Sequence, residues 1–261
     1  MPDNDVRPPT LAWRLYSVWY RHMRVYTRHL VSNGLPPFLE PLIFLIGIGI
    51  GLGRYIHAMD GIPYLVFLAT ALPMTSAMFT ASYECSFGTF VRLQFQKAYE
   101  GMIAAPVTVR DLFVGEILWA GSKGLFFSAC VVLVMGLFGA IPMPGGILAI
   151  PLGFLAGAMF GALGLLVTSF VENINHFNFY FTGFLSPMFF FSGTVFPLDN
   201  LPPILAAMAE LLPLTHAVRL TRSLALGRLS PILLADLAFL LVVTFGAGHL
   251  AIRRLRRRIV V

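Results

Sequence analysis

Residues 147–170 read ILAIPLGFLAGAMFGALGLLVTSF, a stretch without a single charged side chain. An α-helix needs about 20 such residues to cross a hydrocarbon layer of about 30 Å. Five further apolar stretches of similar character lie at 36–53, 64–83, 112–138, 177–196 and 231–252. The chain is 57% hydrophobic and only 11% charged, which excludes a soluble domain of this size. We therefore predict an all-α membrane protein with six transmembrane helices in one membrane domain, 33–255.

Basic residues predict the orientation of these helices. With both ends of the chain inside, thirteen of the eighteen basic residues fall on the cytoplasmic side, four fall on the other side, and Lys123 lies within a span. Cytoplasmic loops of membrane proteins carry this excess of positive charge. We expect an inner-membrane protein with cytoplasmic N- and C-termini, the latter a short basic tail, 256–261. Anionic lipid headgroups explain the arginine clusters more simply than nucleic acid does.

The first segments are expected to lie on the cytoplasmic side. Residues 1–10 are polar and contain prolines, which predicts disorder, and no short cleavable apolar region precedes the first span, which predicts a retained N-terminus. Residues 11–32 contain an amphipathic helix with arginines on one face and aromatic and aliphatic residues on the other, ended by Asn33-Gly34. Such a helix is typical of the headgroup plane, and packing on a soluble partner is the alternative.

Two connections have distinctive sequences. Between the second and third spans, 94–105 is short and amphipathic and is followed by Thr108 and Asp111, which fit a capping box opening the third span. Between the fifth and sixth spans, 197–222 is rich in proline and holds an apolar run too short to span. Broken backbone at membrane depth requires cover from protein or a water-filled path, so we predict short re-entrant helices on the outer side.

Among the ionisable residues in or beside the spans are Glu84, Glu116 and Lys123. Ionisable groups inside a membrane usually face the bundle interior and find partners, so these three are predicted to form an intramembrane polar network. Glu116 and Lys123 are separated by about 10 Å along a helix, which is long for a direct pair. A position near the cytoplasmic boundary, where charge costs little, is the alternative.

The fifth apolar stretch is rich in phenylalanine, and aromatic faces can stack on sugar rings and pack acyl chains. Phe181, Phe184 and Phe189 are therefore candidates for a translocation path. The alternative is that these rings simply face lipid or neighbouring helices.

The sequence offers little for catalysis. Neither lysine lies in a phosphate-binding loop, no Cys/His cluster has metal-ligand spacing, and no nucleophile elbow occurs. Cys85 and Cys130 lie in apolar surroundings and are predicted to be small buried residues rather than a disulfide. A transport protein of this kind draws its energy either from another chain or from an ion gradient.

Several motifs together carry a family resemblance. They are Glu40-Pro-Leu-Ile-Phe-Leu45, Tyr99-Glu-Gly-Met-Ile-Ala-Ala-Pro106, Gly115-Glu-Ile-Leu-Trp119, Phe191-Ser-Gly-Thr-Val-Phe-Pro197 and Leu212-Pro-Leu-Thr-His216. In these motifs, over about 10–255, the chain resembles the ABC-2 class of transporter permeases, and within it the nodulation-type lipo-oligosaccharide exporters. The block from Phe191 to Pro197 is the most specific of the five.

The resemblance implies a permease subunit without an ATPase site of its own. Two copies of a cytoplasmic ATPase would use ATP and Mg²⁺, a second permease subunit would complete a homodimer, and the cargo would be an amphipathic glycolipid or oligosaccharide. It implies a coupling helix that docks on the ATPase, with residues Gln96, Lys97, Ala98, Tyr99, Glu100, Met102 and Ile103. It also implies a re-entrant signature, with residues Phe191, Ser192, Gly193, Phe196, Pro197, Pro202 and Pro213.

Other functions stay open at this point. A drug or lipid exporter of the same class has the same architecture. A gradient-driven transporter would work without an ATPase, although few central carboxylates and no convincing repeat support it. A membrane enzyme acting on lipids lacks a catalytic constellation.

Overall fold

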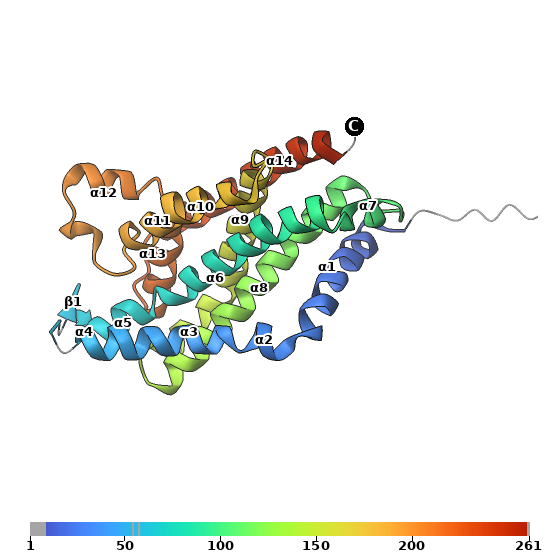
Figure 1. The fold of residues 1–261 in the computed structure, drawn as a ribbon. Coiled ribbons are helices and arrows are strands. Elements are labelled where there is room, and N and C mark those ends of the chain that lie inside the picture. The colour runs from blue at the N-terminus through green and yellow to red at the C-terminus, as the bar shows by residue number, and fades with distance from the viewer. Residues whose placement is uncertain (1–8, 54, 57, 260–261) are drawn as a thin grey trace, which may run out of the picture.

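Four helices form the centre of the fold. The computed structural model describes residues 9–53, 55–56 and 58–259. The prediction of disorder for residues 1–8 and the prediction of a tail at 260–261 therefore concern residues outside the described part. Helices α6 (Leu72–Tyr83), α8 (Val109–Leu137), α9 (Ala149–Thr168) and α14 (Ile232–Ile259) run side by side (Figure 1). They bury a continuous apolar core between them. The predicted all-α membrane architecture is confirmed.

Glycines allow α8 and α9 to approach closely. A Cβ atom on Gly157 of α9 would lie 2.7 Å from the carbonyl oxygen of Ala120 and 3.0 Å from Cα of Gly124, both on α8. In lipid, where no hydrophobic force drives helices together, small residues that permit such contact stabilise the pair. A 3₁₀ turn, η4 (Gly145–Leu148), connects these helices. At the start of α8, the predicted capping box of Thr108 and Asp111 is present.

The first two spans differ from the prediction in their ends. A helical run from Leu30 to Gly53 comprises α2 (Leu30–Gly34), α3 (Pro36–Phe44), the π-helical η1 (Leu45–Ile50) and α4 (Gly51–Gly53). A small hairpin of β1 (Ala58–Met59) and β2 (Ile62–Pro63) follows. The second run continues from α5 (Tyr64–Ala69) through α6 and two π-helical segments, η2 (Glu84–Gly88) and η3 (Val91–Phe95). The helix therefore continues past residue 83, the predicted end of the span, to Phe95.

The N-terminal helix α1 (Leu11–Arg28) ends five residues before Asn33, the start of the predicted break, and His29 is its C-cap. Asn33 is helical, and its side-chain amide donates to the carbonyl oxygen of Tyr26 at 2.9 Å. The hydroxyl of Tyr26 donates in return to the carbonyl oxygen of Asn33 at 2.7 Å. These reciprocal bonds connect α1 to α2 across the break at His29, and α2 itself ends at Gly34, within the predicted break Asn33-Gly34. Helix α1 packs against α8, and its aromatic residues Trp13, Tyr16 and Tyr20 stay exposed.

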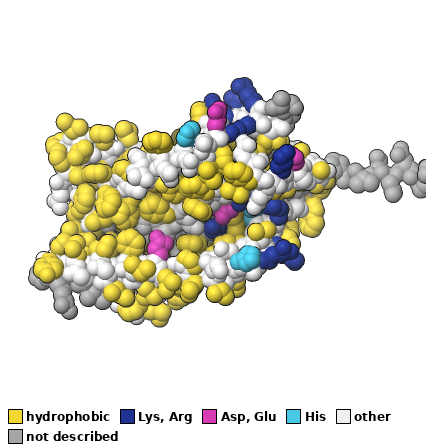
Figure 2. Space-filling view, in the orientation of Figure 1, with side chains coloured by type: hydrophobic (Ala, Val, Ile, Leu, Met, Phe, Trp, Pro, Cys, Tyr) yellow, Lys and Arg dark blue, Asp and Glu magenta, His cyan; other side chains and the backbone are white. Residues whose placement is uncertain are grey.

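One end of the bundle is basic. Helix α1, the short helix α7 (Ala98–Ile103) and the last turns of α14 lie together at this end, which we call the basic end (Figure 1). In the space-filling view, Lys and Arg side chains gather there, while hydrophobic side chains cover most of the remaining face (Figure 2). The opposite end, which carries β1 and the helix α12 (Pro203–Ala209), is called the α12 end.

The fifth apolar stretch is shorter than predicted. It contains η5 (Ile174–His176), α10 (Phe177–Tyr180), the π-helical η6 (Phe181–Leu185) and α11 (Ser186–Phe191), so the helix ends five residues before position 196. Gly193 follows with a φ of 72°, a backbone conformation that favours glycine and turns the chain. In the described part of the chain, five other helical runs are long and apolar enough to span a membrane, or six if one bent pair is counted. That pair is α12 and α13 (Pro213–Ala225), bent by 86° and preceded by η7 (Leu198–Asn200).

Candidate functional site

A buried carboxylate lies at the centre of a polar network near the basic end. Glu116 on α8 is 1% exposed and accepts hydrogen bonds from the Thr89 hydroxyl at 2.6 Å, from Arg92 Nη2 at 3.2 Å and from the Tyr99 hydroxyl. Nε2 of His22, on α1, lies 3.4 Å from its Oε1. Side chains from α1, the second helical run and α7 therefore meet at one carboxylate of α8.

A second carboxylate extends the network. Glu84, in the π-helical η2, accepts from Arg92 Nη1 at 2.8 Å and from Lys123 Nζ at 3.0 Å. The same Lys123 ammonium lies 5.3 Å from the centre of the Tyr26 ring on α1. The structure thus brings together all three residues of the predicted intramembrane network. As expected from the spacing, Glu116 and Lys123 make no direct pair and are connected through Arg92 and Glu84. We call the whole group the Glu116 network, with members His22, Glu84, Thr89, Arg92, Tyr99, Glu116 and Lys123.

The local backbone allows Arg92 to reach both carboxylates. Gly88 lies beside its guanidinium, where an added Cβ would be 3.2 Å from Arg92 Nη1. Isolated buried charges are very costly, but each charge here faces an opposite one and additional hydrogen bonds. The network is therefore a set of matched partners, and removing one of them leaves another charge uncompensated.

The short helix α7 is attached to the network by one residue. Tyr99 is 1% exposed, and burial together with the Glu116 carboxylate raises its pKa well above the usual range, so the hydroxyl remains a donor. Its neighbours Lys97 and Glu100 are exposed and form a 3.9 Å ion pair on the outside. The predicted helix over 94–105 is longer than the observed one: Gln96 and Lys97 lie in the break before α7, and Lys97 has a left-handed φ of 49°.

Helix α1 is attached to the same stretch of α8. Trp19 Nε1 donates to the Ser122 hydroxyl at 2.9 Å, and Arg14 Nε lies 3.3 Å from Asp111 Oδ2. Val18 packs on Gly115, whose missing side chain makes room for it, since an added Cβ would lie 2.6 Å from Val18 Cγ1. The arginine face predicted for α1 is thus partly engaged in contacts within the chain.

A cavity of about 480 Å³ borders the network, between α1 and the segment η2–η3. Aromatic side chains from three segments, Tyr26, Tyr83, Phe87 and Trp119, form part of its wall. Network residues and other polar groups form the rest. A cavity with both kinds of wall suits an amphipathic molecule.

The phenylalanines predicted to line a path do not share one surface. Phe189 is 8% exposed and packs on Phe44 and Phe79, whereas Phe184 is 40% exposed and stacks on Tyr180. Phe181 lies between Tyr83 and Phe87. The structure therefore places these three rings in different environments rather than along one wall, and a role in translocation stays a prediction.

The residues of the predicted re-entrant signature form turns and helix starts at the α12 end. Phe191 ends α11, Ser192 is buried, and the rings of Phe191 and Phe196 lie 6.3 Å apart. Pro197, Pro202 and Pro213 precede or open η7, α12 and α13. Proline is favoured at helix starts because the missing N–H has no helical partner there.

A second charged group lies beside these turns and was not predicted. Asp236 of α14 is 1% exposed and accepts from Arg219 Nη2 at 2.6 Å, while His216 Nδ1 lies 2.7 Å from the same oxygen. Arg219 also makes a bidentate pair with Glu210, at 2.7 and 2.9 Å. We call these four residues the Asp236 cluster. It joins the bent pair α12–α13 to α14.

Sequence reasoning missed His22 and Thr89 as network members, as well as the Asp236 cluster. The partners are up to 94 positions apart along the chain, as for His22 and Glu116, and only packing brings them together. One usable signal existed, because a lone acidic residue in an apolar stretch, such as Asp236, needs a partner. Among the residues that the structure describes, no group of His, Cys, Asp or Glu side chains is suited to hold a metal ion.

Long apolar helices around buried ion pairs define a multi-pass membrane protein with a polar centre near one end. The chain matches the family model of the ABC-2 type transporter over residues 14–226, and it belongs to that family. It is therefore a membrane transport protein, as the sequence motifs predicted.

Known relatives agree with this assignment. The chain is 36% identical to nodulation protein J of Sinorhizobium fredii, over 84% of each chain. It is 32% identical to nodulation protein J of Rhizobium meliloti, again over 84% of each chain. It is also 25% identical to the inner membrane transport permease YadH of Escherichia coli, over 80% of this chain and 81% of that one.

Proposed function

We propose that this chain is the permease subunit of an ATP-driven exporter that moves an amphipathic glycolipid or lipo-oligosaccharide across the inner membrane. Two permease copies would form the path, and two copies of a separate ATPase would bind ATP and Mg²⁺. The family assignment and the relatives named as nodulation and inner-membrane proteins support this proposal. Drugs and other lipids are the alternative cargoes within the same class.

The observation that carries the proposal is the attachment of α7. Tyr99 fixes this short helix to Glu116, while Lys97 and Glu100 face outward and are free to meet another protein. A partner that moves α7 would thereby pull on α8 through Glu116, on the second span through Arg92 and on α1 through His22. Packed helices respond to such a pull as rigid bodies that shift between arrangements.

In this proposal the basic end is cytoplasmic. The ATPase would meet α7 there, and the arginines of α14 would lie beside anionic headgroups. The α12 end would then face the outside, with the re-entrant pair closing the exit.

Reconstitution tests the proposal directly. The chain is placed in proteoliposomes with a candidate partner ATPase, and ATP-dependent movement of a fluorescent glycolipid is measured. We expect transport to require ATP and to stop when the ATPase carries an inactivating substitution. Transport by the chain alone, without nucleotide or ATPase, would reject the proposal in favour of a gradient-driven carrier.

Accessibility tests the orientation separately. An epitope inserted after Asn200 should react with antibody in intact right-side-out vesicles, whereas one after Val261 should react only after permeabilisation. The opposite pattern would reverse the assignment of the two ends and remove the proposed ATPase side.

A further inference from the structure

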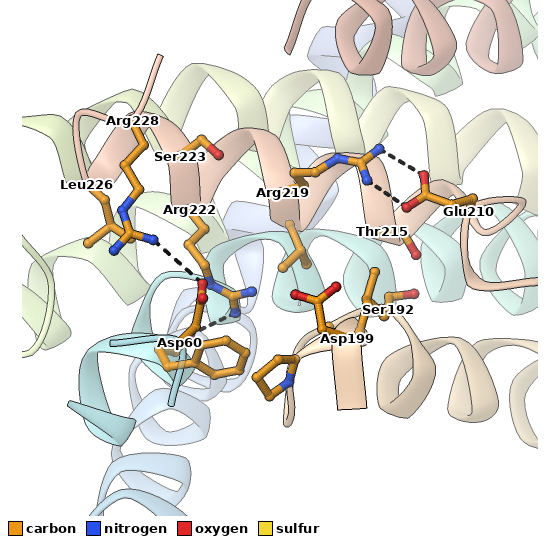
Figure 3. A pocket seen from close by; sticks show the side chains of 15 residues that line it. Asp60, Ser192, Asp199, Glu210, Thr215, Arg219, Arg222, Ser223, Leu226 and Arg228 are labelled. Atoms are coloured by element: carbon orange, nitrogen blue, oxygen red, sulfur yellow. Dashed lines mark hydrogen bonds and ion pairs between the residues drawn. The ribbon is translucent and has the colours of Figure 1, made fainter. Parts of the chain in front are cut away.

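A pocket of about 250 Å³ at the α12 end lies outside the polar network and has no role in the proposal above. Its walls are α13, the turn that follows α11, and the start of α5 (Figure 3).

The pocket has no net charge. Three acidic and three basic side chains line it. Two of the basic ones are paired: Arg219 with Glu210, and Arg228 with Asp60 at 3.6 Å. Arg222 and Asp199 remain, and neither has an ion-pair partner within 4 Å among the described residues. Both point into the pocket in Figure 3.

Arg222 is held in one position. Its guanidinium lies over the Phe67 ring, 3.7 Å from the ring centre. Nη2 donates to the carbonyl oxygen of Phe67 at 2.9 Å, and Nε donates to the Thr70 hydroxyl at 3.2 Å. For Nη1, the described part of the chain supplies no acceptor. A fixed donor of this kind loses little conformational entropy when it binds a ligand.

A third polar group in the pocket lacks a partner. Ser192 is 1% exposed, and its hydroxyl makes no hydrogen bond with the described residues. Leaving such a buried group unsatisfied carries a desolvation penalty. A group that both donates and accepts hydrogen bonds would recover this energy.

The three groups together specify a ligand class. Arg222 offers donors, the Asp199 carboxylate offers acceptors, and the Ser192 hydroxyl offers both. Vicinal hydroxyls of a sugar can accept from the first and donate to the second, whereas an anion would face the carboxylates of Asp60, Asp199 and Glu210. The volume is below the roughly 300–1,000 Å³ of sites for drug-sized ligands, which favours one ring over a long chain.

We propose that this pocket binds a neutral saccharide unit. The inference rests on the proposed function, because it makes the pocket a contact for a sugar-bearing cargo at the end where that cargo leaves. The Asp236 cluster would keep the α13 wall in place, since it joins α13 to α14.

Binding is measured on the full chain in a detergent without a sugar headgroup. Saturation-transfer NMR is recorded with three neutral tetrasaccharides: cellotetraose, maltotetraose and chitotetraose. We expect a signal from at least one of them and a loss of tenfold or more in apparent affinity for Arg222→Gln and for Asp199→Asn. Arg256→Gln, at the exposed basic end, is the matched control and should bind like the parent. No signal from any sugar, or equal signals in all variants, would overturn the proposal.

A second measurement excludes misfolding and an anion site. Cys85 and Cys130 are buried, so the substitution Ser223→Cys places one accessible thiol on the pocket wall. The bound tetrasaccharide should slow its labelling by a maleimide several-fold, and inorganic phosphate at the same concentration should not. Protection by phosphate alone would mean an anion site and refute the saccharide assignment. Neither assay uses nucleotide or ATPase, so a negative result leaves the export proposal intact.

Discussion

The two charged groups at opposite ends of the bundle differ in how much solvent reaches them. In the Glu116 network, the side chains of Glu84, Arg92 and Glu116 are 15%, 13% and 1% exposed. In the Asp236 cluster, the side chains of Glu210 and Arg219 are 46% and 25% exposed. The first joins four separate segments through buried pairs, while the second joins one bent helix pair to α14 and opens onto a pocket. The buried Glu116 network is suited to transmit movement between helices, and the partly exposed Asp236 cluster is suited to lie beside a bound ligand.

Replacing Glu116 tests the buried side of this comparison and should have the largest effect. Glu116→Gln leaves Arg92 without one of its two carboxylates, and breaking a buried pair costs about 3–5 kcal/mol. We expect an unfolding free energy lower by about that amount and no ATP-dependent export, measured by denaturant unfolding and by the vesicle assay.

Glu172→Gln provides the control, because Glu172 is an exposed carboxylate at the basic end. It should change stability by less than about 0.5 kcal/mol. Equal stability of Glu116→Gln and the parent would mean that the network is not a structural connection.

Replacing Asp236 tests the other end. Asp236→Asn removes the charge that faces Arg219 and His216, but Glu210 and solvent still compensate the guanidinium. We therefore expect a smaller loss than for Glu116→Gln, about 2–3 kcal/mol, in the same unfolding assay. A loss equal to or above that of Glu116→Gln would remove the distinction between the two groups.

Replacing Tyr99 separates stability from coupling. Tyr99→Phe deletes one donor to Glu116, and a hydrogen bond to a charged group contributes about 1.5–3 kcal/mol. We expect a loss near the lower value, with ATP hydrolysis retained but export reduced at least tenfold. Tyr55→Phe, at an 85% exposed tyrosine, is the control. Unchanged export by Tyr99→Phe would argue against α7 as the coupling element.

Replacing Glu210 should have the smallest effect. Its pair with Arg219 is half-exposed, and such pairs contribute about 0–1 kcal/mol. Glu210→Gln should therefore change the unfolding free energy by less than about 1 kcal/mol. A larger change would show that the stability of the Asp236 cluster depends on Glu210.

Local signals in the sequence were sufficient for much of the fold. Apolar stretches located the long helices, Thr108 and Asp111 located the start of α8, and proline and glycine located the bent pair after Gly193. Helix ends were harder to predict. The second helical run continues to Phe95, and Glu84 and Arg92, which lie beyond the predicted end of the span, pair with each other inside the bundle.

The candidate site was predictable in its members but not in its connections. Glu84, Glu116 and Lys123 stood out because charge in an apolar stretch needs a partner. Which partner each one finds depends on how α1, α8 and the second span pack, and Lys123 pairs with a residue 39 positions away. The bond from Tyr99 to Glu116 was not predicted for the same reason, because nothing in the local sequence shows that this residue of the expected coupling helix is buried.

The π-helical turns divide the bundle into two kinds of helix. Within the described residues, η1 lies in the first helical run, η2 and η3 in the second run and η6 in the fifth apolar stretch, whereas α8, α9 and α14 contain none. A π turn holds one residue more than an α turn, and each residue adds about 1.5 Å of rise and 100° of rotation. Converting one π turn into an α turn would shift all later residues of that helix by one position, while the hydrogen-bonded backbone remains continuous. The first and second helical runs and the fifth apolar stretch thus contain turns whose helical register can change, while α8, α9 and α14 provide a constant surface against which those helices can shift.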